Sequence, residues 1–316
     1  MTQSLEEIAL GLTSRSERRR PVHDVTACIP TVGEAGDVVR TVRSLLNGRA
    51  YPGTILVSDA SHGQQARSML ERTLEEPGVA NEVELRVLPS PPNGSETGNR
   101  NWLASHVRTP LLLFVDDDVD VHLDFLYDAV ASIGAGHFDV VVAASTSMGG
   151  SGWLTTRGHF RPIEPGDPIA VGLACSLWRS DLFRSLWLDE RIGYGYGDAE
   201  LSFRLHRLRP STVEQSAHDF VHRGDGETHP ERDKEAERAR GYVAVRRYSD
   251  SRWALARFLI LEMSCNALRG RRLLPRAQVP GQWRSLAKHL IGGQAPVWAR
   301  VDAPHASTAD GRERAA

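Results

Sequence analysis

Four carboxylates follow one apolar run in this sequence. The segment LLLFVDDDVDVH places them directly after Val115, at Asp116, Asp117, Asp118 and Asp120. Carboxylate oxygens are hard ligands that suit Mg²⁺ or Mn²⁺, and these ions usually complete their coordination shell with substrate phosphates. The alternative is a solvated turn, or a helix cap supplied by Asp120, which leaves the three earlier aspartates unexplained. The cluster therefore predicts a divalent metal site that also binds a diphosphate.

Two further polar residues have positions suited to nucleotide binding. Asp59 ends the apolar segment TILVSD, where its carboxylate can accept hydrogen bonds from a base N–H or a ribose hydroxyl. An aspartate that starts a turn is the alternative there. Arg100 stands at the start of the predicted helix NRNWLASHV, where it can meet a phosphate or balance the acidic cluster. A helix N-terminus favours anions in the same place.

A glycine-rich segment carries the candidate general base. In IGYGYGDAELSFRL the glycines allow a loop to lie close to a ligand, and Asp198 and Glu200 stand where that loop enters a helix. A carboxylate at this point can remove a proton from an attacking hydroxyl. Asp198 can equally cap the helix, and the two roles are compatible.

Three histidines follow in the last part of this region, at His218, His222 and His229. A neutral imidazole can complete a metal site, so one of these histidines is a candidate ligand. The favoured interpretation of His218 and His229 is that they are surface residues.

Composition narrows the possible functions. The 38 basic and 40 acidic side chains nearly cancel, which argues against a nucleic acid partner. Three widely spaced cysteines argue against a disulfide framework and for a reducing compartment. The N-terminal segment lacks the apolar core of a signal peptide, and no run of about 18 apolar residues occurs. These features predict a cytoplasmic protein without a transmembrane segment.

Periodicity indicates the elements that position these residues. Segments with strand character are 25–30, 54–59, 83–89, 111–115 and 138–146. Segments with apolar residues at helical spacing are 37–48, 64–74, 99–107 and 199–208. Alternating strands and helices are typical of a parallel sheet covered on both faces. Ligands bind beyond the carboxyl ends of such strands, so Thr31, Asp59 and the acidic cluster are expected to converge.

The remaining chain is less regular. Residues 146–168 are rich in Gly, Ser, Thr and Pro and are expected to form a mobile loop, whereas residues 252–268 predict an amphipathic helix. That helix can dock on the rest of the chain, mediate dimerisation or touch a membrane surface, and docking is favoured. Arg246, Arg247, Arg252 and Arg257 permit the membrane version.

Taken in order, these segments resemble the inverting family 2 glycosyltransferases, which have the GT-A fold. The resemblance runs from about Val25 to His222. It includes TACIPTVGEAGDVVRTVRSLL, ILVSDAS, GNRNWLASHVRTPLLLFVDDDV, GLACSLWRSDLF and LDERIGYGYGDAELSFRLHR.

The resemblance implies an α/β chain with a Rossmann-like, mostly parallel central sheet and flanking helices, plus a helical C-terminal extension. We expect four parts with the following bounds: an N-terminal extension over 1–22, a GT-A glycosyltransferase domain over 23–229, a helical region over 230–300 and a disordered tail over 301–316.

The resemblance also implies an activity and a set of site residues. A sugar would pass from a nucleotide diphosphate sugar to an acceptor hydroxyl with inversion, with Mn²⁺ or Mg²⁺ as cofactor. Asp198 matches the family's base. The implied donor-binding residues are Pro30, Thr31, Asp59, Arg100, Asp116 and Asp117. The implied metal ligands are Asp118, Asp116 and His222. On the acceptor side the resemblance points to Trp178 and Glu200.

Three positions depart from the family pattern. Gly197 stands where a glutamate usually precedes the base, which makes Glu200 the reserve candidate for that role. Thr31, Val32 and Gly33 replace a more common aromatic and asparagine, and His122 replaces a common proline.

Two other functions fit parts of the same pattern. A nucleotidyltransferase shares this sheet architecture and metal use, but it would carry a basic, Gly-rich loop after the first strand. Here no Lys or Arg occurs from Pro30 until Arg40. A non-catalytic carbohydrate-binding protein that keeps the fold is the second alternative, and neither the acceptor nor a possible homodimer follows from the sequence.

Overall fold

The computed structural model describes residues 19–31, 35–59, 65–75, 83–91, 94–145, 152–164, 167–210, 212–223, 230–268 and 281–294. Residues 1–18 of the predicted N-terminal extension, His229 and the predicted tail over 301–316 lie outside these ranges.

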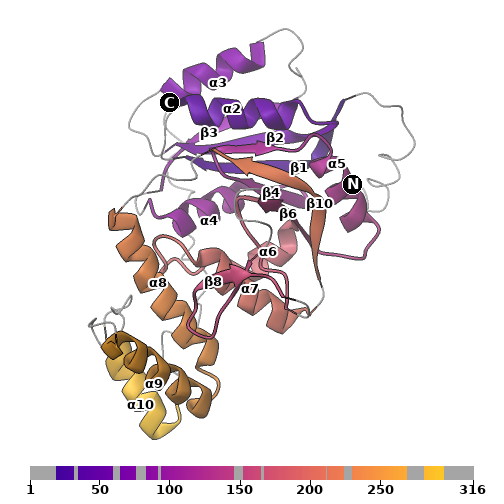
Figure 1. The fold of residues 1–316 in the computed structure, drawn as a ribbon. Helices are drawn as coiled ribbons and strands as arrows, with labels where there is room; N and C mark the ends of the chain where they lie inside the picture. Colours follow the sequence, from indigo (N-terminus) through magenta and orange to yellow (C-terminus); the bar gives the residue numbers. More distant parts are fainter. Residues whose placement is uncertain are drawn as a thin grey trace.

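An eight-stranded sheet forms the centre of the molecule (Figure 1). From edge to edge its strands are β3 (Glu84–Pro89), β2 (Ala50–Asp59), β1 (Arg20–Thr31), β4 (Leu111–Val115), β9 (Cys175–Arg179), β6 (Val140–Ser145), β10 (Val213–His222) and β5 (Val119–Val121). Strands β3, β2, β1 and β4 run parallel, as do β6 and β10. Strand β9 is antiparallel to both of its neighbours, and β5 is antiparallel to β10. The predicted mostly parallel α/β fold is confirmed.

Helices cover both faces of the sheet. Helices α2 (Ala35–Leu46), α3 (Gln65–Glu75) and α5 (Phe125–Gly134) lie on one face, and α4 (Glu96–His106), α6 (Ser180–Leu186) and α7 (Gly197–Leu208) lie on the other (Figure 1). Along β1, Ala27 and Ile29 belong to the core under the first set of helices, while Cys28 belongs to the core under the second. Because both faces are covered, all five residues of β4 are buried and apolar.

The register of the strands brings their carboxyl ends together. Thr31 at the end of β1 pairs with Asp59 at the end of β2, and Asp59 in turn pairs with Pro89. Strand β4 ends beside the same edge, so the acidic segment leaves the sheet next to the end of β1. The predicted convergence follows from this register.

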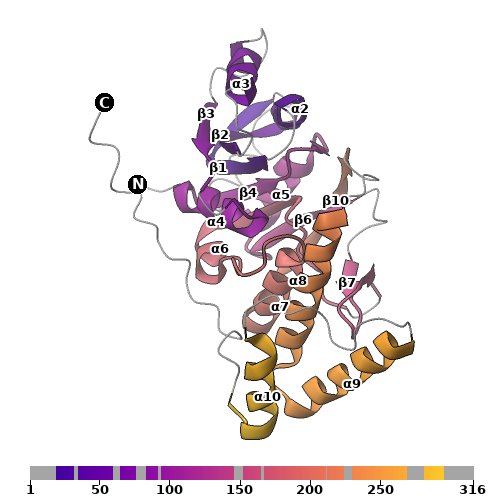
Figure 2. The same cartoon turned by 90° about the vertical axis from the view of Figure 1, so that its left-hand side faces the viewer.

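A third core joins the C-terminal helices to α7. Helix α8 (Pro230–Tyr248) leads away from the sheet to α9 (Arg252–Leu268) and α10 (Gln282–Gly292), as Figure 2 shows. Leu255 and Phe258 of α9 pack in this core together with Ala199 of α7 and Leu286 of α10. The predicted helix over 252–268 therefore does dock on the rest of the chain.

A buried ion-pair cluster holds α9 to α8. Glu262 of α9 pairs with Arg240 of α8 at 2.8 Å and with Arg157 at 2.9 Å. Arg246 and Arg247 are also engaged inside the protein, with Asp189 and with the carbonyl of Leu154 respectively. The sequence analysis considered these two arginines for contact with a membrane surface, but in the structure both contact other residues of the protein.

In the described ranges, no helix is both long enough and apolar enough to cross a membrane.

The structure departs from the sequence prediction at three places. The region expected to be a mobile loop contains a small antiparallel sheet of β7 (Gly152–Leu154) and β8 (Phe160–Pro162). Trp153 of β7 packs against Phe203 of α7, and Leu154 is buried in the core of the C-terminal helices, so two side chains of β7 attach this segment to the protein. Strands β5 and β10 were not predicted, because β5 is three residues long and β10 is largely polar.

Candidate active site

The acidic segment between β4 and β5 is held by Thr41 of α2 and by Arg223, which directly follows β10. The Asp117 carbonyl accepts hydrogen bonds from the Thr41 hydroxyl at 2.7 Å and from the Arg223 guanidinium at 3.2 Å. The Arg223 backbone N–H donates to the Asp118 carbonyl at 2.9 Å. Asp120 does not cap a helix, because it lies in β5 and its carboxylate pairs with Arg223. The fourth carboxylate thus fixes the loop.

Arg100 neutralises the first carboxylate. Its guanidinium, almost fully buried, donates to Asp116 on one side and to Glu96 on the other. Burial alone would lower the pKa of Arg100, but the two carboxylates outweigh it and raise that pKa. Of the two roles predicted for Arg100, the structure supports the one that balances the acidic cluster.

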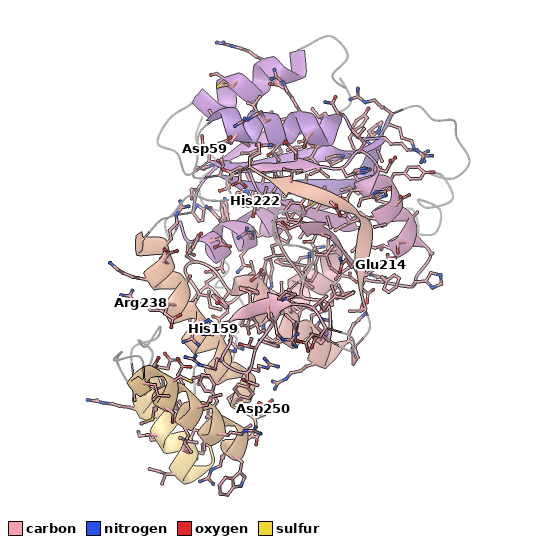
Figure 3. All side chains as sticks on the ribbon, in the orientation of Figure 1. Asp59, His159, Glu214, His222, Arg238 and Asp250 are labelled. Atoms are coloured by element: carbon pink, nitrogen blue, oxygen red, sulfur yellow. The ribbon has the colours of Figure 1, made fainter. Side chains whose placement is uncertain are left out.

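Thr31 positions the second carboxylate. Its hydroxyl donates to the Asp117 carboxylate, and the threonine itself is buried at the end of β1. Pro30 precedes it and pairs in register with Ser58. Asp59, the last residue of β2, is partly exposed at the same end of the sheet. Figure 3 shows Asp59 and His222 on this side, whereas Glu214 marks the opposite end of β10.

The third carboxylate faces a histidine. Asp118 Oδ1 lies 3.3 Å from His222 Nε2, and this buried oxygen receives no hydrogen bond from the residues that the structure describes. Burial raises the pKa of Asp118, an effect that His222 offsets only in part. A buried carboxylate oxygen beside an imidazole nitrogen is a donor pair that suits Mn²⁺ or Mg²⁺.

The predicted set of three metal ligands is not gathered. Asp116 pairs with Arg100 instead, and the described part of the chain contains no group of three or more His, Cys, Asp or Glu side chains around one possible metal position. Of the three predicted ligands, Asp118 and His222 remain as a candidate pair, and a cation there would take its other ligands from substrate oxygens and water. This is the usual way in which Mg²⁺ binds with phosphates.

Helix α4 holds the glycine-rich loop against the acidic segment. The Glu96 backbone N–H donates to the Gly193 carbonyl at 3.0 Å, and the Glu96 carboxylate accepts from the Gly195 N–H at 2.9 Å. The Thr97 hydroxyl donates to the Ile192 carbonyl at 2.6 Å. A Cβ atom on Gly197 would lie only 2.7 Å from Thr97 Cγ2, so a side chain at this position would force the loop away from α4.

Asp198 is the second residue of α7, directly beyond this loop. Its Oδ1 accepts a hydrogen bond from the adjacent Ala199 N–H at 2.7 Å. The N-cap position of α7 is Tyr196, without a side-chain cap hydrogen bond, so Asp198 does not cap the helix as predicted. Burial raises the pKa of Asp198 to about 6, and the negative charge of Glu96 adds to that effect against the opposing influence of Ala199 N–H and Arg100. A carboxylate with such a pKa is ionised at neutral pH and is a better proton acceptor than an ordinary aspartate.

Glu96 was missed as a site residue in the sequence. It joins the two parts of the site, since its carboxylate contacts both Arg100 and the loop that carries Asp198. The only sequence signal is the spacing of four residues between Glu96 and Arg100 on one helix, which is common for surface ion pairs as well.

The two residues predicted on the acceptor side lie in the protein interior. Trp178 of β9 is completely buried, and its indole N–H donates to the Ser176 hydroxyl at 2.9 Å. Glu200 pairs with Arg204 at 2.7 Å and with Arg246 at 3.2 Å, and it too is buried. Neither side chain reaches a surface where an acceptor could bind, so the predicted acceptor-side roles are wrong.

His218 lies away from the acidic segment, on β10. Its Nε2 pairs with Asp128 at 2.6 Å, and its ring stacks on that of His122. The surface role expected for His218 is consistent with this placement.

Comparison with solved structures supports the same fold class. S. aureus TarS in complex with UDP matches with a TM-score of 0.51 and 18% identity over 84% of this chain and 80% of that one. A mannosyltransferase, PcManGT from Pyrobaculum calidifontis, in complex with GDP-Man and Mn²⁺, matches with a TM-score of 0.51 and 13% identity over 92% and 93%. GalNAc-T7 with UDP, GalNAc and Mn²⁺ matches with a TM-score of 0.54 and 13% identity over 73% and 51%.

The mostly parallel sheet, with an acidic segment beyond one of its central strands, thus has the GT-A fold of these glycosyltransferases. The sequence pattern of Glycosyl transferase family 2 matches residues 26–189, just over half of the 316 residues, and the chain belongs to that family. A comparison with curated proteins finds no match.

Proposed function

We propose that this protein transfers a sugar from a nucleotide diphosphate sugar to an acceptor hydroxyl, with inversion at the anomeric carbon and with a divalent cation. One observation carries the proposal. Arg100 pairs with Asp116 and with Glu96, and Glu96 in turn contacts the loop before Asp198, whose pKa is raised. These contacts link the acidic segment to the candidate base. A diphosphate site and a general base at neighbouring positions are what such a reaction requires.

The acidic segment would bind the donor. Asp59 at the end of β2 would contact the nucleotide base or ribose, and Pro30, Thr31 and Asp117 would shape the adjacent wall. The UDP complex of TarS and the GDP-Man complex of PcManGT support a nucleotide-sugar ligand for a chain of this fold.

Asp118 and His222 would hold Mn²⁺ or Mg²⁺. When bound there, the cation would neutralise the charge that develops on the departing nucleotide diphosphate. The Mn²⁺ named in the PcManGT and GalNAc-T7 structures supports this choice of metal. Asp116 would remain paired with Arg100, which keeps the neighbouring carboxylate from competing for the cation's position.

Asp198 would act as general base. Its carboxylate takes the proton of the acceptor hydroxyl while the hydroxyl oxygen forms a bond to the anomeric carbon and the bond from that carbon to the diphosphate oxygen breaks. Because this is a single displacement, the configuration at the anomeric carbon inverts. Arg100 and Glu96 hold the two parts of the site together and do not themselves exchange protons.

We also propose that residues 23–229 form the catalytic domain and that the helical region after residue 230 supports it, as the packing of α8 against α7 suggests.

The test is a transfer assay with UDP, GDP and dTDP sugars in the presence of Mn²⁺, followed by NMR of the anomeric proton. We expect at least one donor to release its nucleoside diphosphate. Without an acceptor this release should be slow, because it comes from hydrolysis of the donor. The transferred sugar should have the inverted configuration. Formation of a nucleotide sugar and pyrophosphate from a sugar phosphate and a nucleoside triphosphate would instead identify a nucleotidyltransferase. Donor binding without any turnover would identify a non-catalytic binding protein.

A further inference from the structure

Helix α9 carries large apolar side chains on its outward side as well as on its buried side. The buried residues are Leu255, Phe258, Glu262 and Asn266, and large apolar side chains are also exposed to solvent. Trp253 is 88% exposed, Ile260 66% and Leu268 87%, and Ile291 at the end of α10 is 83% exposed. Large apolar groups that remain this exposed on adjacent helices mark an interaction surface.

The exposed residues of α9 form one continuous stripe. Trp253, Ile260 and Leu268 are separated by seven and eight residues, which places them on the same side of an α-helix. Arg257 and Leu261 fill the spaces between them and are also exposed. We call this stripe, together with Ile291, Arg284 and Lys288 of α10, the α9–α10 face.

This part of the chain is strongly cationic. Residues 252–294 contain eight Lys or Arg and one acidic residue, Glu262, in a chain whose total charge is −2. Glu262 is buried and paired with two arginines, so it contributes no negative charge to the surface. The exposed charges of the α9–α10 face are Arg257, Arg284 and Lys288, all of them positive.

The face lies at one end of the molecule. Helices α9 and α10 lie at the end of the molecule opposite to α2 and α3, beyond the lower end of α8 (Figures 1 and 2). The other side of α9 is already used, since Leu255, Phe258 and Glu262 attach it to α8.

We propose that the α9–α10 face binds an anionic lipid surface. Exposed Trp, Ile and Leu next to Arg and Lys on one side of a helix are the features of a helix that lies in the interface plane of a membrane. The apolar side chains would enter the boundary between headgroups and acyl chains, while the cationic ones would contact lipid phosphates. A second copy of the chain is a poorer occupant, because a symmetric contact would place two cationic faces against each other.

The test is flotation of the purified full chain with vesicles of phosphatidylcholine alone and of phosphatidylcholine mixed with phosphatidylglycerol. We expect wild-type protein to float only with the anionic vesicles and to be released as salt is raised. Two triple variants test the two components: Trp253→Ser with Ile260→Ser and Leu268→Ser, and Arg257→Gln with Arg284→Gln and Lys288→Gln. Each is expected to lower the vesicle partition coefficient at least about tenfold.

The matched control is Leu123→Ser with Leu208→Ser, which removes two exposed leucines from other surfaces and should leave binding unchanged. Circular dichroism checks that each variant is folded. The proposal is overturned if wild-type protein does not bind anionic vesicles, or if the serine variant binds as well as wild type. A dimer in size-exclusion chromatography that the serine variant converts to monomer, without vesicle binding, would assign the face to self-association. Flotation needs neither donor nor metal, so its result is separate from that of the transfer assay.

Discussion

Neighbouring aspartates of one segment have different roles because each has a different partner. Asp116 faces Arg100, Asp117 accepts from Thr31, Asp118 lies beside His222 and Asp120 pairs with Arg223. Only Asp118 has a buried oxygen without a hydrogen bond from the described residues. Of the four carboxylates, Asp118 is therefore the one that we propose as a cation ligand.

The proposed base is tested by Asp198→Asn. An amide cannot accept the acceptor proton, so we expect the turnover number to fall by a factor of about 10² to 10⁴ while donor affinity is retained. Steady-state kinetics and donor titration of the same preparation measure both quantities. Asp181→Asn, at a largely exposed carboxylate of α6, is the matched control and should turn over normally. Wild-type turnover in Asp198→Asn would remove Asp198 from the mechanism.

The influence of Glu96 is tested by the pH dependence of transfer. Activity requires ionised Asp198, which exists above its pKa, so the wild-type rate should fall as the pH drops through about 6. Glu96→Gln removes a negative charge that raises this pKa, and the acidic limb of the profile should move to lower pH. The midpoint of kcat/KM against pH is the measurement. A midpoint that stays in place would show that Glu96 does not act on the base.

At the scale of elements, helix α4 organises the site. Its first turn contacts the glycine-rich loop through Glu96 and Thr97, and its second turn reaches the acidic segment through Arg100. The loop itself can approach so closely because Gly197 has no side chain. The departure from the family pattern at Gly197 thus has a steric reason in this protein.

The close contact is tested by Gly197→Ala. The added methyl group would meet Thr97 Cγ2, so we expect the loop and Asp198 to shift and the turnover number to fall at least about tenfold, as small displacements of catalytic groups are costly. Thr97→Ser removes the opposing methyl group and keeps the hydroxyl, so the double variant should recover most of the activity. A double variant as impaired as Gly197→Ala would contradict this account of the glycine.

The attachment of α9 is tested by Glu262→Gln. This change leaves the buried Arg240 without its buried carboxylate, and we expect a loss of about 3 kcal/mol in the free energy of unfolding. Glu237→Gln removes the other carboxylate that contacts Arg240, but that carboxylate is half-exposed, so the loss should stay within about 1 kcal/mol. Urea unfolding of both variants measures the difference. Equal losses would mean that the buried position of Glu262 is not what matters.

Elements with strong apolar periodicity were predictable from the sequence, and polar ones were not. The wholly apolar segment of β4 predicts a buried strand, and the regular spacing of Val38, Val42 and Leu45 predicts helix α2. Strand β10 alternates weakly, and its place in the sheet depends on pairing with β6, which lies about 70 residues earlier in the chain. Long-range pairing of this kind has no local signature.

The site was predictable only in part for a similar reason. The positions of Asp118, His222 and Asp198 could be proposed from motifs, whereas the roles of Trp178 and Glu200 could not be judged without their burial. Whether a polar side chain faces a site or an internal ion pair depends on neighbours from other elements. Arg246, which pairs with Glu200 from α8, illustrates this dependence.

At the scale of the whole molecule, the sheet and the C-terminal helices present two surfaces that differ in charge and in side-chain chemistry. The carboxyl ends of the strands present carboxylates, and the α9–α10 face presents arginines, lysine and apolar groups. Under the two proposals, one end of this nearly neutral chain would bind a cation with a diphosphate and the other end would bind an anionic surface.

The central claim is that Asp118, with His222, holds the cation of the donor, and calorimetric titration of Mn²⁺ in the presence of UDP, GDP or dTDP tests it most directly. The wild-type protein should bind one Mn²⁺ with at least one nucleoside diphosphate among UDP, GDP and dTDP. Asp118→Asn should weaken that binding at least about tenfold, because losing a metal ligand should cost at least as much as losing a residue that supports a ligand. Asp124→Asn, at the start of α5, should bind as wild type does, because its side chain makes no cap hydrogen bond. Unchanged Mn²⁺ affinity in Asp118→Asn would contradict the account.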